Sequence, residues 1–152
     1  MTLDATDKAL LGLLQEDAQL TSEALGQRLN LSASQAGRRR QRLEAQGVIE
    51  GYRARLAPEK VDLGVEAVIR IVMATHTEEN ARDFLRLTRT TPEIVGAWTL
   101  TGEADYLLRV FTTDLSDLNR LVQSRLLPHP AVSRVHSQIV MERVKSDGPL
   151  PL

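Results

Sequence analysis

The period of the apolar residues changes once along the chain, near Pro58 and Gly64, and this change limits the possible folds. Before it, apolar residues recur at intervals of three and four, which is typical of amphipathic helices. From Val65 onward, runs of β-branched residues alternate with helical segments. We therefore expect an α+β chain with a helical domain over residues 1–56, a linker over residues 57–64 and a second domain over residues 65–152.

The first domain carries start and stop signals for three short helices. A side chain that accepts backbone N–H bonds can cap a helix start, and a residue suited to a left-handed turn can end one. The predicted starts are Asp4, Thr21 and Ser32, and two predicted ends are Asn30 and Gly47. Apolar residues over 48–56 are spaced as a strand that returns beside the helices as a wing. The pattern predicts a (winged) helix-turn-helix.

The second domain contains six predicted elements in the order β-α-β-β-α-β. This is the ferredoxin-like order, in which two helices cover one face of a sheet and leave the other open. An open apolar face needs a partner, so we predict that two copies dimerise through their sheets. The elements are expected at residues 65–74, 78–90, 94–100, 106–111, from 114 or 116 to 126, and 132–144, with residues 101–105 as a hairpin connection.

The third predicted helix holds a cluster of arginines: Arg38, Arg39, Arg40 and Arg42. The net charge of the chain is -1, so any contact with nucleic acid must come from such local clusters and not from bulk charge. A charge run by itself is usually a solvated helix face. In a helix-turn-helix, however, the second helix of the motif lies in the major groove, and this position favours DNA contact.

Short motifs in both halves resemble the leucine-responsive regulator (Lrp/AsnC) family. Those of the first half are Leu3-Asp4, residues 13–18, Leu31-Ser32-Ala33-Ser34, Arg39, Arg42-Leu43-Glu44 and Gly47-Val48-Ile49. Those of the second half are Thr101-Gly102, residues 105–108, residues 137–145 and Leu150-Pro151-Leu152. The resemblance implies a DNA-binding domain joined to an effector-sensing domain, dimers that assemble into octamers or similar discs, and transcription regulated by amino acids.

Helix-turn-helix geometry and the resemblance together assign double-stranded DNA contact to six residues. Gln35 is expected to pair with adenine through its amide, and Arg38 with guanine O6 and N7. Arg39 and Arg42 are expected to bind phosphates. The full set is Ser32, Ser34, Gln35, Arg38, Arg39 and Arg42.

Two residues of the same helix have no settled role. Gly37 either admits close approach of DNA or is tolerated at a cost of about 1 kcal/mol relative to Ala. Arg40 stands where the family usually has an apolar residue. Its stem is therefore expected to cross the core, with its head at a phosphate or at an acid.

In the second domain the expected ligand is a small effector, an amino acid. Asp105 can hold an α-ammonium group while loop N–H groups take the carboxylate, and Gly102 lets a ligand approach the backbone. The resemblance implies an effector site between subunits, formed here by Trp98, Gly102, Asp105, Gln138 and Ile139. Alternatively, Asp105 only closes the hairpin and Trp98 only fills the core. Glu103-Ala104 stands where many relatives have an acid followed by an aromatic residue.

Composition argues against other classes of function. The chain has no Cys, and no segment has the character of a membrane span or a secretion signal, so we expect a cytoplasmic protein. His76, His129 and His136 lack the spacing of a metal pair and are expected to be surface or packing residues. We predict no cofactor, no metal and no enzymatic activity.

Two rival functions share this architecture. One is a DNA-organising protein that responds to no effector, which a panel of amino acids tested for thermal stabilisation would distinguish. The other is a decarboxylase of modified tetrapyrroles, since some proteins that resemble the family have that activity. A porphyrin-like chromophore on the purified protein would indicate it.

Overall fold

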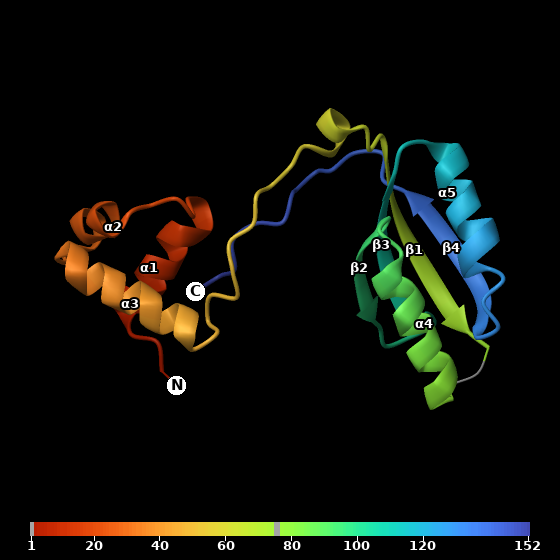
Figure 1. The fold of residues 1–152 in the computed structure, drawn as a ribbon, viewed down its shortest axis with the longest axis horizontal. Coiled ribbons are helices and arrows are strands. Elements are labelled where there is room, and N and C mark those ends of the chain that lie inside the picture. Colours follow the sequence, from red (N-terminus) through yellow and green to blue (C-terminus); the bar gives the residue numbers. More distant parts are fainter. Residues whose placement is uncertain (1, 75–76) are drawn as a thin grey trace. The chain divides into compact units, whose positions relative to one another are not determined.

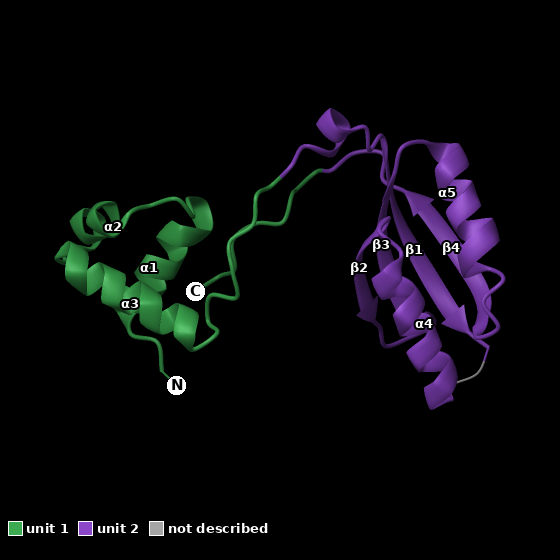
Figure 2. Cartoon of the chain, viewed as in Figure 1, with its two compact units in different colours: residues 1–55, 144–152 green, residues 56–143 purple. Residues whose placement is uncertain are grey.

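The computed structural model describes residues 2–74 and 77–152 (Figure 1). His76, expected to be a surface or packing histidine, lies outside the described residues. The chain forms two compact units: Met1–Arg55 with Val144–Leu152, and Leu56–Arg143 (Figure 2). Among the helices described, none has the length and apolar character needed to cross a bilayer.

The first unit consists of three short helices, as predicted. They are α1 (Ala5–Glu16), α2 (Ser22–Leu29) and α3 (Ala33–Ala45). The side chains of Asp4, Thr21 and Ser32 each accept a backbone N–H at the start of a helix. Asn30 and Gly47 have positive φ angles of 56° and 69°, so both predicted stops are confirmed.

Residues from all three helices form the core of the first unit. Leu10, Leu25, Ala36 and Leu43 are fully buried. The turn between α2 and α3 is tight, because a Cβ atom at Gly26 would lie 2.6 Å from the backbone oxygen of Leu31. The requirement for glycine here comes from a contact across the turn, which no local sequence pattern indicates.

Two boundaries differ from the expectation. Among the described residues, 50–57 form no strand, so the predicted wing is absent. A strand needs a hydrogen-bonded neighbour, and the pattern of apolar residues does not supply one. Residues 144–152, expected in the second domain, belong to the first unit. Leu150 donates its N–H to Gln15 Oε1 at 2.5 Å, and Gln15 Nε2 donates to the Leu150 carbonyl at 3.3 Å.

The second unit is a four-stranded antiparallel sheet with two helices, in the predicted ferredoxin-like order. The spatial order of the strands is β2-β3-β1-β4. The last strand ends at Ile139 and not at residue 144. The elements are η1 (Pro58–Val61), β1 (Val65–Met73), α4 (Glu78–Thr90), β2 (Ile94–Thr99), β3 (Tyr106–Thr112), α5 (Leu115–Leu121), η2 (Val122–Leu126) and β4 (Val132–Ile139).

Both helices of this unit cover the same face of the sheet. Phe84 of α4 and Leu118 of α5 belong to one buried cluster with Ile69 and Leu108 of the central strands. Because side chains alternate along a strand, the residues between these positions face the other side of the sheet. The part of the chain that the structure describes places no helix over that open face.

Candidate nucleic-acid interface

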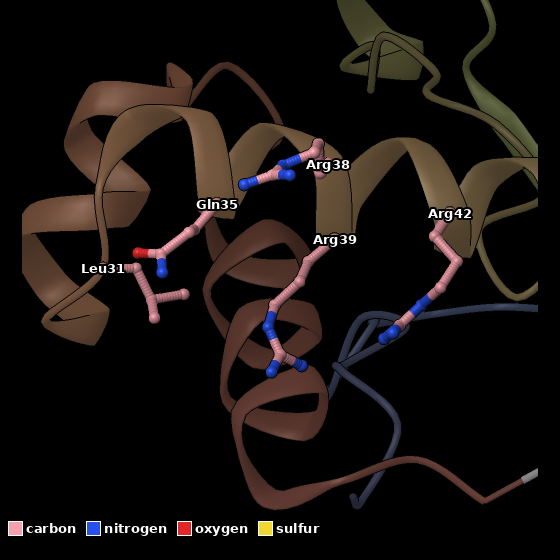
Figure 3. A pocket seen from close by; sticks show the side chains of 5 residues that line it. All are labelled: Leu31, Gln35, Arg38, Arg39 and Arg42. Carbon is pink, nitrogen blue, oxygen red and sulfur yellow. The ribbon is translucent and has the colours of Figure 1, made fainter.

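The six residues expected to contact DNA all lie on α3 or at its N-cap. Four of them line one surface depression of about 350 Å³ together with Leu31: Gln35, Arg38, Arg39 and Arg42 (Figure 3). Arg39 and Arg42 extend from the same side of α3 (Figure 3). Ser32 and Ser34 are exposed at the start of the helix. The structure thus brings the predicted set together on one element.

The first turn of α3 is held by a reciprocal pair of side-chain bonds between Ser32 and Gln35. The Gln35 N–H donates to Ser32 Oγ at 3.1 Å, and the Ser32 N–H donates to Gln35 Oε1 at 2.9 Å. This capping box satisfies two backbone donors that the helix leaves unpaired. A bidentate bond to adenine needs the amide oxygen as well as the amide nitrogen, and this oxygen already accepts the Ser32 N–H. Gln35 must therefore either share the oxygen or release the cap.

Arg38 is the arginine with the fewest partners in the depression. Its Nε donates to the Ser34 carbonyl at 3.4 Å, near the outer limit for a hydrogen bond, and its side chain is exposed. No ion pair of Arg38 occurs within the described residues. Its guanidinium donors are therefore available to a ligand at the surface of α3.

Arg39 and Arg42 are instead tied to acids of α1. Arg39 Nη1 donates to Asp4 Oδ2 at 2.7 Å and to Asp7 Oδ1 at 2.8 Å. Arg42 Nη2 donates to both oxygens of Asp7 at 2.6 Å. Hydrogen bonds to these carboxylates raise the pKa of Arg39, and the bond from Arg39 lowers the pKa of Asp4. Both arginines are thus part of an ion-pair network between α1 and α3.

Arg40 has a structural role at an acid, which is one of the two placements expected for its head. Its Nε donates to Glu44 Oε1 and to the Tyr52 hydroxyl, both at 3.0 Å, and its Nη1 donates to the Leu20 carbonyl at 3.0 Å. The Tyr52 hydroxyl also donates to Glu44 Oε1 at 2.8 Å. Bonds from Tyr52 and Arg40 lower the pKa of Glu44. Arg40 therefore joins α3 to the segment that follows it.

Gly37 packs against α2. A Cβ atom at this position would lie 3.0 Å from Ser22 Oγ, at the start of α2. The residue therefore serves the close approach of α2 and α3. This contact could not be predicted from the sequence, because Ser22 and Gly37 come together only when α2 packs against α3.

The residues expected to bind an effector fall into two groups. Gly102 and Asp105 lie in the β2–β3 hairpin with Trp98, whereas Gln138 and Ile139 lie at the end of β4. Since β2 and β4 are the two edge strands, the groups occupy opposite edges of the sheet. One chain does not bring the set together. A single site from all five residues needs a second copy.

Asp105 closes the hairpin, as one of the two alternatives held. Its Oδ2 accepts the N–H of Met73 at 2.7 Å, its own N–H donates to the Ile71 carbonyl at 2.9 Å, and its carbonyl accepts the Leu100 N–H at 2.8 Å. Gly102 has a φ of 109°, a backbone conformation that favours glycine, and open space where a Cβ would lie.

Trp98 does not fill the core. Half of its surface is exposed, and its ring lies over Gly96, where a Cβ atom would approach ring carbon Cη2 to 2.5 Å. Trp98 is opposite Leu107 in the β2–β3 pairing, so it faces the open side of the sheet. It is therefore available to a ligand or a second chain.

A hollow of about 380 Å³ on the open face contains charged residues for which the sequence predicts no site. Arg70, Arg134 and His136 line it together with Val72, Glu103 and Ala104. Strand pairing brings Arg70 opposite His136, and Val72 opposite Arg134. Alternation along each strand could have placed these residues on one face, but the pairing of β1 with β4 could not be derived from the pattern. His136 is thus exposed at a hollow.

His129 has a packing role, as expected. Its ring meets the Phe84 ring edge-on with centroids 5.6 Å apart, and its Nδ1 accepts the Ala131 N–H at 3.2 Å. Among the described residues no group of three or more His, Asp or Glu side chains is arranged to hold a metal ion.

Comparison with known proteins finds matches over both units. An AsnC-type helix-turn-helix domain model matches residues 3–44, and the Lrp/AsnC ligand binding domain model matches residues 66–150. The chain is 35% identical to the DNA-binding transcriptional activator DecR of Escherichia coli over 150 residues, which cover 99% of each protein. It is 34% identical to the glutamate uptake regulatory protein of Zymomonas mobilis, over 99% of this chain and 91% of that protein.

Solved structures agree with this result. A transcriptional regulator from Neisseria meningitidis, solved as its complex with L-Met, superposes with a TM-score of 0.94 and 39% identity, covering 99% of this chain and 97% of that one. An AsnC family transcriptional regulator from Agrobacterium tumefaciens gives a TM-score of 0.91 and 32% identity, covering 98% of this chain and 97% of that one.

Proposed function

The chain belongs to the Lrp/AsnC family, and on this basis we propose that it is a transcription regulator that binds specific DNA sequences and responds to an amino acid. The observation that carries the DNA-binding part is the depression on α3, where exposed Arg38 and Gln35 lie beside Arg39 and Arg42. The second helix of a helix-turn-helix enters the major groove with its N-terminal residues nearest the bases.

Each residue of this surface has a proposed role. Arg38 pairs with guanine through O6 and N7, a contact worth about 1–3 kcal/mol of discrimination. Gln35 donates from its amide nitrogen while the capping box persists, and Ser32 and Ser34 contact the duplex at the start of the helix. Arg39 and Arg42 bind phosphates and set the position of α3 along the groove.

Selection of duplexes from a random-sequence library by the full-length protein tests this function. The proposal expects enrichment of a common sequence, here called the selected duplex. It also expects binding at least a hundredfold tighter than to a scrambled duplex of the same length and composition, since specific and non-specific affinities typically differ by about 10³ or more. Enrichment of no sequence would contradict it.

For the second unit we propose an amino-acid effector bound between two copies of the chain. The relatives support this ligand class, since one is a glutamate uptake regulator by name and another was solved with L-Met. The proposed residues are Trp98, Gly102, Asp105, Gln138 and Ile139, which lie at two edges of the sheet in one chain.

Self-association through the open sheet face would supply the second copy. Partly exposed apolar side chains on this face have no covering helix in the described residues: Val68, Val72, Trp98, Leu107 and Phe111. We propose a dimer through this face, with assembly to an octamer or a similar ring. Sedimentation of the wild type and of Leu107→Glu tests it, because a buried charge at the centre of the interface should yield monomers. An unchanged mass would place the interface elsewhere.

Thermal melts with each of the common amino acids test the effector. An amino acid at 100 times its dissociation constant should stabilise the folded state by about 2.7 kcal/mol and raise the melting temperature visibly. No shift with any amino acid would favour a DNA-organising protein without an effector. We propose no catalytic activity for the chain, and a cytoplasmic location where it has access to DNA.

A further inference from the structure

Asp7 is a nearly buried carboxylate at the centre of the network between α1 and α3. Only 4% of its side chain is exposed, compared with 52% for Asp4 and 46% for Arg42. Asp7 bonds to two arginines that belong to the proposed DNA-binding surface, and those arginines lie on a different helix. Asp7 therefore holds two side chains of that surface through one buried carboxylate.

The bonds to the acids occupy one terminal nitrogen of each arginine. A guanidinium carries five N–H donors on three nitrogens. Arg39 uses Nη1, and Arg42 uses Nη2. Within the part of the chain that the structure describes, Nε and the other terminal nitrogen of both residues make no hydrogen bond. Each arginine therefore keeps donors for a phosphate while its bond to the Asp7 carboxylate fixes its position.

We infer that Asp7 is a positioning residue for DNA binding: it holds Arg39 and Arg42 in the conformation in which their remaining donors meet phosphates. This inference rests on the proposed DNA-binding function. Two long side chains are ordered when the unit folds, so their rotamer entropy is not lost again on binding. Arg42 Nη2 bonds to both oxygens of Asp7, which anchors that end of its guanidinium at the buried carboxylate.

Charge alone predicts the opposite role for Asp7. The two acids and the two arginines sum to zero net charge, so a neutral residue at position 7 adds one positive charge to the surface. If Asp7 only reduced the positive potential of the DNA-binding surface, a neutral residue at position 7 would tighten binding to any DNA. If Asp7 positions the arginines, the same change weakens binding to the selected duplex. The sign of the effect distinguishes the two roles.

The test measures affinity of the full-length protein for the selected duplex and for the scrambled duplex, by fluorescence anisotropy at one fixed salt concentration. The variants are Asp7→Asn and Asp7→Glu, with Glu16→Gln as the matched control. Glu16 is an exposed residue at the end of α1, and its change adds the same charge without touching the arginines. Circular-dichroism melts check that each variant is folded.

For Asp7→Asn we expect about a tenfold loss of affinity for the selected duplex, because the phosphate contacts of Arg39 and Arg42 set the register on which the base contacts depend. Binding to the scrambled duplex needs no single register, so its affinity should be unchanged or higher, as for Glu16→Gln. Asp7→Glu, which keeps the charge, should recover part of the loss. Tighter binding of Asp7→Asn to both duplexes would overturn the inference. Equal weakening on both duplexes would also overturn it, because a purely structural role would not separate specific from non-specific binding.

Asp4→Asn keeps the inference testable if Asp7→Asn does not fold. Asn and Asp are about equally good helix N-caps, so this substitution should preserve the start of α1. Of the two arginines, only Arg39 bonds to Asp4. A loss of a few fold on the selected duplex, with none on the scrambled one, supports positioning, and no loss contradicts it. If the wild type prefers no sequence, the proposed function fails together with this inference. If the wild type prefers the selected duplex but Asp7→Asn binds that duplex more tightly than the wild type does, only this inference fails.

Discussion

The guanidinium carbon of Arg40 lies 4.7 Å from the centre of the Tyr52 ring, and Arg40 Nε also donates to the Tyr52 hydroxyl at 3.0 Å. Arg40 is in α3, and Tyr52 lies in the segment that leaves the helical unit. Glu44 accepts hydrogen bonds from both. The proposed DNA-binding helix and the connecting segment are thus joined by a cluster of three side chains.

Tyr52→Phe should lower the free energy of unfolding of the first unit by about 1 kcal/mol, because it removes the hydroxyl that bonds to Glu44 and Arg40. Urea titrations of the full-length protein measure the change. Arg53→Ala is the control, since Arg53 is an exposed neighbour with no hydrogen bond in the described residues. A loss as large in Arg53→Ala would show that the cluster contributes nothing specific.

Gly26→Ala and Gly12→Ala form a matched pair of helix substitutions with opposite expected signs. A methyl group at Gly26 meets the Leu31 backbone oxygen at 2.6 Å, so this change should destabilise the unit by about 1–3 kcal/mol. Nothing lies within 4 Å of a Cβ at Gly12, so there Ala should stabilise by up to about 1 kcal/mol. Thermal melts compare them. Equal effects would contradict the packing described for the turn.

The structural role of Asp105 predicts a stability loss that needs no effector. Asp105→Ala leaves the N–H of Met73, a buried residue, without its carboxylate partner. The expected loss is about 1–3 kcal/mol in the free energy of unfolding. It should be measured on protein purified without amino acids. A variant as stable as the wild type would leave ligand binding as the remaining role for this acid.

Glu66 predicts how the stability of the second unit depends on pH. Burial raises the pKa of this carboxyl, but hydrogen bonds from Arg143 and Arg109 at 2.6 and 2.7 Å outweigh it, so the pKa is lowered. A lowered pKa contributes stability above the ordinary value of about 4.3, and that stability is lost as pH falls through the folded value.

Glu66→Gln should therefore be less stable than the wild type at pH 7, and the difference should shrink between about pH 5 and pH 3. Melting temperatures of both proteins across this range check it. A difference that stays constant with pH would mean that the ionised carboxylate is not what the arginines stabilise.

The features that could be predicted from the sequence are those with local causes. Asp4, Thr21 and Ser32 cap helices that start within three residues of them, and the hairpin connects strands next to each other in the chain. The order of the elements then indicated the ferredoxin-like unit. The arginine cluster was likewise visible as a run of one residue type.

What could not be predicted depends on pairs far apart in the chain. Arg42 and Asp7 are separated by 35 positions, and Gln15 and Leu150 by 135. Spacing does not say which acid an arginine meets, so Arg39 and Arg42 were assigned to phosphates without their bonds to α1. The packing of residues 144–152 with the first unit could not be predicted for the same reason.

Arg38→Ala tests whether α3 is the element that binds specific DNA. The control Lys8→Ala removes the same charge from an exposed position of α1. Anisotropy titrations with the selected duplex should show about a tenfold or greater loss for Arg38→Ala, as expected for a bidentate contact to guanine, and a much smaller loss for Lys8→Ala. Equal losses in the two variants would mean that Arg38 of α3 makes no specific contact with the DNA.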